Sequence, residues 1–76
     1  MSRHELHRAI IDYEDHRAVT KYCLQQASDT EKAISYFEAL NSNDRQKLDE
    51  AISLMREVAD RHDGKAKELD EEYGPL

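Results

Sequence analysis

Glycine, proline and cysteine, the residues that mark turns and crosslinks, are nearly missing from this 76-residue chain. The first glycine is Gly64, the one proline is Pro75 and the one cysteine is Cys23. No stretch alternates apolar and polar residues as a β-strand does, and no Asn-Gly or Asp-Gly turn joins two β-rich segments. A single cysteine also excludes an internal disulfide. The sequence therefore predicts an all-α protein of one domain, residues 1–76, without covalent crosslinks.

Long apolar runs are missing as well. The longest runs have three residues, as at Ala9–Ile11, whereas a helix that crosses a bilayer needs about 20 apolar residues. The N-terminal segment Met-Ser-Arg-His-Glu has no apolar core after its charges, so we expect neither a secretory signal nor a membrane partner. A lone cysteine is typical of a reducing compartment, and we expect a cytoplasmic protein.

Acidic residues outnumber basic ones by 17 to 11, which gives a net charge of −6. Charges in residues 1–24 cancel, so residues 25–76 carry the whole excess. A nucleic acid is an unsuitable direct ligand for such a chain, because binding to phosphates needs clustered Lys and Arg. The balance indicates either a basic partner or a highly soluble surface.

Helix start and stop signals divide the chain into three helices, long, short and long. Ser2 with Glu5 forms a capping-box pattern, and nothing interrupts the first helix before Gln26-Ala27, a length of about 36 Å. Ser28 with Glu31 repeats the pattern and opens a second helix of about 18 Å that ends at Asn41. The third helix is predicted from Asp44 to about His62, capped by Ser42 or Asn43, with Asp63-Gly64 as its stop. Its apolar stripe comprises Leu48, Ala51, Ile52, Met55, Val58 and Ala59.

The last segment of the chain is strongly acidic and has few residues to bury. We expect residues 63–76 to be either a frayed acidic tail or, over Lys65–Tyr73, a short docking helix. Tyr36 and Phe37 lie on the predicted short helix, and both are expected to be core residues.

Two opposite sides of the first helix are apolar, and this pattern predicts a homodimer. Leu6, Ile10, Tyr13 and Leu24 are assigned to the second and third helices, and the dimer interface is assigned to Ile11, Ala18 and Tyr22. The two faces could be exchanged, because periodicity fixes their separation but not their partners. A first helix of about 36 Å could not be covered along its full length by a second of about 18 Å and a third of about 30 Å, which also favours a second chain.

Motifs for catalysis or metal binding are weak throughout. His4 and His7 stand one helical turn apart but lack the third and fourth ligands that zinc needs. Cys23 has no basic neighbour to activate its thiol, so a structural role is expected. The chain has no phosphate-binding loop and no arrangement for nucleophilic catalysis. The sequence predicts a protein that is not an enzyme and that uses neither a cofactor nor a metal.

The leading hypothesis is an acidic helical module that inhibits a basic protein, for example a DNA-binding one, by presenting carboxylates in place of phosphates. Carboxylates on successive helical turns stand about 5–6 Å apart, near the phosphate spacing of a nucleic-acid strand. The predicted binding residues are Asp49, Glu50, Glu57, Asp60, Asp63, Glu68, Asp70, Glu71 and Glu72. The alternative is a structural or adaptor subunit that docks through an apolar helix face.

Overall fold

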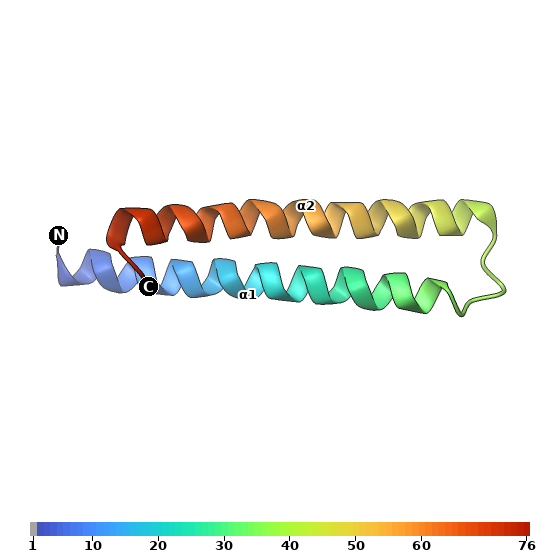
Figure 1. Ribbon diagram of the computed structural model, residues 1–76, viewed down its shortest axis with the longest axis horizontal. Coiled ribbons are helices and arrows are strands. Elements are labelled where there is room, and N and C mark those ends of the chain that lie inside the picture. Colours follow the sequence, from blue (N-terminus) through green and yellow to red (C-terminus); the bar gives the residue numbers. More distant parts are fainter. Residues whose placement is uncertain (1) are drawn as a thin grey trace.

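The computed structural model describes residues 2–76 as a hairpin of two long helices (Figure 1). Helix α1 spans Arg3–Ile34 and α2 spans Ser42–Tyr73, each of 32 residues. The helices run antiparallel, and the rod they form measures 56 × 15 × 14 Å. We call the end with the loop the tip and the end with both termini the open end. The all-α prediction is confirmed, but the prediction of three helices is wrong.

Helix α1 begins where the sequence predicted and ends later. The backbone N–H of Glu5 donates to the Ser2 side chain over 3.1 Å, as the capping box requires. The predicted break at Gln26-Ala27 is absent, and the segment around Ser28 continues the helix. The physical reason is that Thr20, Ala27 and Ile34, spaced seven residues apart, are all buried against α2. Continuing the helix buries this stripe, which outweighs a local capping pattern.

Helix α2 begins after Asn41, whose side chain accepts from the N–H of Asp44 over 2.8 Å, so neither Ser42 nor Asn43 is the cap. The predicted stop at Asp63-Gly64 is also wrong, because the helix continues to Tyr73 and ends at Gly74. The acidic tail is therefore helical over nearly its whole length. Ala66, two residues beyond Gly64, is buried against α1, and this packing offsets the cost of a helical glycine.

The two helices meet along a line, here called the seam, whose residues are spaced alternately four and three apart. This is the heptad pattern of a coiled coil. On α1 the seam comprises Ala9, Tyr13, His16, Thr20, Cys23, Ala27, Thr30 and Ile34. On α2 it comprises Leu48, Ile52, Met55, Ala59, His62, Ala66, Leu69 and Tyr73. Every one of these side chains is buried or half-buried. Of the stripe predicted on the third helix, Leu48, Ile52, Met55 and Ala59 are in the seam, whereas Ala51 and Val58 are half-buried beside it.

The apolar core lies near the tip, where Ala27, Ile34 and Ile52 are buried and Leu40, Leu48 and Met55 pack against them. The predicted core positions of Tyr36 and Phe37 are wrong. Both side chains lie in the loop and are 81% and 56% exposed, because the first helix already ends at Ile34. In the part of the chain that the structure describes, neither helix is apolar enough over a sufficient length to cross a membrane.

Equal helix lengths change one premise of the predicted dimer. The expectation of a second chain rested partly on a long helix facing a short one. In the structure each 32-residue helix covers the other along the rod (Figure 1). The length mismatch does not exist, and any case for a dimer must come from the exposed surface.

Candidate interaction surface

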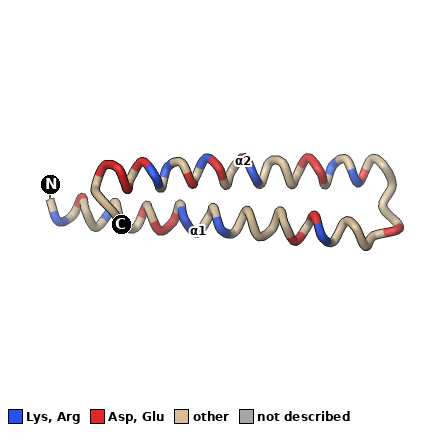
Figure 2. The backbone as a smooth tube through the Cα atoms, viewed as in Figure 1, with Lys and Arg blue, Asp and Glu red and all other residues tan. Residues whose placement is uncertain are grey.

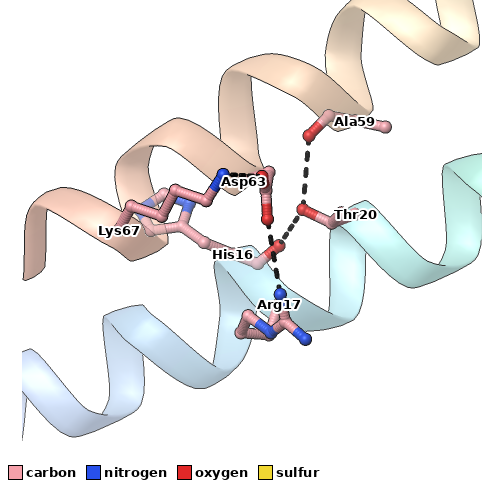
Figure 3. A network of polar contacts seen from close by, with 6 residues as sticks. All are labelled: His16, Arg17, Thr20, Ala59, Asp63 and Lys67. Atoms are coloured by element: carbon pink, nitrogen blue, oxygen red, sulfur yellow. Dashed lines mark hydrogen bonds and ion pairs between the residues drawn. The ribbon is translucent and has the colours of Figure 1, made fainter. Parts of the chain in front are cut away.

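One side of the seam is crossed by ion pairs, and we call it the ion-paired flank. Arg17 donates to Asp63 over 3.3 Å, and Lys67 lies 3.0 Å from the other oxygen of the same carboxylate (Figure 3). Nearer the tip, Arg56 of α2 lies 2.8 Å from Glu31 of α1. Exposed pairs of this kind each contribute about 0–1 kcal/mol. Their main effect here is to neutralise Asp63 and Glu31.

Four of the predicted binding acids form a surface with no such neutralisation. Asp49, Glu50, Glu57 and Asp60 are all exposed, and within residues 2–76 none of them forms an ion pair. Glu50 and Glu57 lie on the outer side of α2, opposite the seam, whereas Asp49 stands on the same line of α2 as Arg56 and Asp63, and Asp60 borders the groove along the ion-paired flank. We call these four residues the acidic face. Figure 2 shows both signs of charge along each helix, with acids crowded at the end of α2.

The other predicted binding acids have different surroundings. Asp63 is doubly ion-paired, and Glu68 lies 3.9 Å from Lys65 on the same helix. Asp70 accepts a hydrogen bond from the backbone N–H of Leu76 over 3.0 Å, and the chain end turns from the end of α2 towards α1 (Figure 1). Glu71 and Glu72 are exposed beside the C-terminus. The nine predicted residues therefore do not form one uniform surface.

The surroundings of Tyr73, near this acidic end, change the ionisation of its phenol. The negative charge of Glu72 raises the pKa of the Tyr73 phenol above its usual value of 10.0. Desolvation and the carboxylates of Glu5 and Asp12 act in the same direction. Tyr73, at the end of the predicted tail, thus lies close enough to α1 for the carboxylates of Glu5 and Asp12 to act on its phenol.

A polar cluster that the sequence did not predict lies at the middle of the seam. Nδ1 of His16 and Nδ1 of His62 are 2.8 Å apart, with ring centroids 5.0 Å apart. The Thr20 hydroxyl lies 2.9 Å from the carbonyl oxygen of His16 and 3.3 Å from that of Ala59 on the facing helix (Figure 3). The seven-residue periodicity that brings His16 to face His62 was the available signal. It was hidden by the prediction of a break in each helix.

The residues of this cluster do not form a metal site. Within residues 2–76 no three His, Cys, Asp or Glu side chains come together to hold a metal. His4 and His7 are exposed on the first turns of α1, and Cys23 is half-buried in the seam as a free thiol. An open groove of about 520 Å³ runs along the ion-paired flank between Leu24 and Asp60. Its shape suits a protein surface rather than an enclosed small molecule.

Exposed apolar side chains are spread over several surfaces of the rod. The predicted dimer residues Ile11, Ala18 and Tyr22 are all uncovered, and Tyr22 is 65% exposed. On α2, Leu54 is 60% exposed, and on the ion-paired flank Leu24 is 48% exposed. Leu54 was not among the residues predicted from the sequence, because it lies outside the apolar stripe of the predicted third helix.

Comparison of the chain with protein-family models, with curated proteins and with solved structures found no match.

Proposed function

We propose that this chain is a non-enzymatic helical hairpin that binds a basic protein through the acidic face of α2. The observation that supports this proposal is that Asp49, Glu50, Glu57 and Asp60 are exposed and unneutralised within residues 2–76. Other acids, such as Glu31 and Asp63, are held by cations of the hairpin itself. Four carboxylates left without counter-charges on one helix are available to cations of a partner.

The geometry of α2 suits a partner that ordinarily binds nucleic acid. Helix α2 has 32 residues and extends for about 48 Å. Carboxylates on successive turns stand about 5–6 Å apart, as Glu57 and Asp60 do, which is close to the interval between phosphates. Asp49 and Glu50 stand about two turns before Glu57, so they match phosphates two intervals away. A net charge of −6 also attracts a basic protein at long range. The hairpin acts as an inhibitor by occupying the DNA-binding surface of that partner.

Affinity capture from the native cell tests this proposal. We expect the immobilised hairpin to retain a basic protein that elutes as salt is raised, because salt screens exposed charges. The variant Glu50→Gln/Glu57→Gln should lose most of this capture. Its matched control is Glu14→Gln/Glu38→Gln, which removes the same charge from exposed residues outside the acidic face. Equal loss in both variants would leave only a general charge effect, and no loss in either would overturn the proposal.

The alternative function is an adaptor that docks through apolar contacts. The sequence assigned these contacts to a helix face, whereas the observation that favours an adaptor lies in the loop at the tip. Tyr36 and Phe37 are adjacent in the loop and are both largely exposed. Docking through such side chains is insensitive to salt, in contrast to binding through the acidic face. A captured partner that resists high salt and is lost from Tyr36→Ser/Phe37→Ser would favour this function.

We also propose that the hairpin works as a homodimer. Its accessible surface is 5981 Å², whereas a compact monomer of 8.9 kDa exposes about 4,800 Å². A stable interface covers about 800 Å² of each partner, which is less than the excess of about 1,200 Å². The excess surface of the elongated hairpin is therefore large enough to include an interface with a second copy. Light scattering coupled to size exclusion tests the dimer through its mass.

A further inference from the structure

The side of the seam opposite the ion pairs is more apolar, and we call it the apolar flank. At 100° per residue, Val19 lies across the seam line from Arg17, and Val58 lies likewise from Arg56. Val19, Val58 and Ala51 are half-buried, whereas Arg17 and Arg56 are exposed. The apolar flank thus has an uncharged floor close to the seam.

Tyr22 and Leu54 stand at the outer edges of this floor. Tyr22 follows Val19 by three residues, and Leu54 precedes Val58 by four, so each adjoins the floor on its own helix. Tyr22 is 65% exposed and Leu54 is 60% exposed. Because Thr20 is level with Ala59, Tyr22 and Leu54 lie within about one helical turn of each other along the rod. Together with Val19, Ala51 and Val58 they form an apolar patch that spans both helices.

Charged residues flank this patch in a regular order. Asp15 and Asp29 stand seven residues before and after Tyr22, on the same line of α1. Lys47 and Arg61 stand seven residues before and after Leu54, on the same line of α2. All four are exposed, and within residues 2–76 none of them forms an ion pair. Each apolar residue is therefore placed between two charges, negative on α1 and positive on α2.

We infer that a second copy of this chain covers the apolar flank, with the two hairpins parallel and their tips at the same end. This inference rests on the homodimer proposed above and specifies its face and orientation. A two-fold axis along the rod sets α1 of one copy against α2 of the other. Tyr22 then meets Leu54 of the partner chain, and Asp15 and Asp29 meet Arg61 and Lys47.

The distances along the rod agree with this arrangement. Measured from the level of Thr20 and Ala59, Asp15 and Arg61 are offset by about 4.5 Å, and so are Asp29 and Lys47. Extended Arg and Lys side chains span such an offset. The other two-fold arrangement, with tips at opposite ends, sets α1 against α1. It brings Asp15 to Asp29 and Arg61 to Lys47, and like charges oppose it.

Three matched substitutions to glutamate test the face. Leu54→Glu places an unpaired charge in the proposed interface, and we expect the dimer to weaken by roughly a hundredfold. Leu24→Glu on the ion-paired flank should leave the dimer unchanged. Ile11→Glu should also leave it unchanged, because the proposed face keeps only Tyr22 of the three residues that the sequence assigned to the interface, and Ile11 lies on the outer side of α1. All three residues are partly exposed in the hairpin, so helix content should be retained. A monomeric wild type would overturn the homodimer itself, whereas a dimer indifferent to Leu54→Glu would overturn only the choice of face.

Mixing two charge variants tests the orientation. Asp15→Arg alone sets Arg against Arg61 of the partner chain, and Arg61→Asp alone sets Asp against Asp15. Each contact occurs twice in a symmetric dimer, so we expect each variant to dimerise about tenfold more weakly than the wild type. An equimolar mixture restores both contacts and should form heterodimers of wild-type affinity. A mixture that behaves as the sum of its components would exclude the arrangement with tips together.

Discussion

The Thr20 hydroxyl reaches the backbone carbonyl of Ala59 on the facing helix, with 3.3 Å between the two oxygens. A side chain as short as threonine spans two helices only where their backbones approach closely. Ala27, Ala59 and Ala66, each at most 2% exposed, allow this approach because they add little bulk to the seam. Thr20 and Ala27 on α1, and Ala59 and Ala66 on α2, are small residues seven positions apart, and they keep the two helices close over the middle of the hairpin.

A larger side chain at this point should force the helices apart. Ala59→Leu overpacks the seam and breaks the contact to Thr20, and we expect a loss of about 1–3 kcal/mol of stability. Ala18→Leu is the matched control, since Ala18 is exposed on α1 and its substitution should leave the free energy of unfolding nearly unchanged. Urea unfolding followed by circular dichroism measures both. Equal effects would show that the helices are not closely packed at Ala59.

The two glycines should respond to alanine in opposite directions. Gly64 lies inside α2, and a Cβ atom placed there meets nothing within 4 Å. Gly64→Ala should therefore stabilise the hairpin by about 0.5–1 kcal/mol, because alanine loses less entropy in a helix. Gly74 has a φ of 81° at the end of α2, so Gly74→Ala should destabilise it. A destabilising Gly64→Ala would instead support a helix stop at that position.

The histidine contact requires two different tautomers. The Nδ1 atoms of His16 and His62 are 2.8 Å apart. For a hydrogen bond to form, one of these two atoms must carry the proton and the other must accept it. Nitrogen-15 spectra at neutral pH should show one ring protonated at Nδ1 and the other at Nε2. His16→Leu/His62→Leu replaces both partners with apolar groups and should leave the stability equal or higher. Identical tautomers in the two rings would contradict the contact.

Tyr73 should ionise at higher pH than a free tyrosine. Because the folded pKa is raised, the neutral phenol is favoured in the folded state, chiefly by Glu72. The stability from this group is present below the ordinary pKa of 10.0 and is lost as the pH rises through the folded value. Glu72→Gln should bring the pKa closer to its ordinary value. Following the Tyr73 ring resonances by NMR across this range measures the change, and a pKa insensitive to Glu72→Gln would assign the shift to another cause.

Composition and periodicity were sufficient to predict an all-α chain, because the absence of strand patterns and the spacing of Leu48, Ile52, Met55 and Ala59 are local properties. The helix count was not predictable from the same signals. Taken alone, Ser28 with Glu31 signals a helix start, and Asp63 with Gly64 signals a helix stop. Burial of Ala27 on α1 and of Ala66 on α2 outweighs these two signals. That burial depends on the facing helix and cannot be judged from one segment.

The acidic face was predictable in part. A helical wheel shows that Glu50 and Glu57 lie opposite the apolar stripe of their own helix and that Asp49 and Asp60 lie to one side of it. The ion pair between Asp63 and Arg17 joins residues 46 positions apart in the chain, so the neutralisation of Asp63 becomes visible only in the folded hairpin. The line of Lys47, Leu54 and Arg61 on α2 also becomes a candidate interface only in the folded hairpin, where it lies on the same flank as Tyr22 of α1.

The distance between two tips tests the paired hairpin most directly. A spin label attached at Ser42→Cys, in a chain whose own thiol is removed by Cys23→Ser, marks the tip end of each copy. Pulsed electron paramagnetic resonance on the dimer then measures the separation of the two labels. With the hairpins parallel, the separation should be well under half of the 56 Å rod length. A separation near the full rod length, or no dipolar coupling at all, would contradict the account.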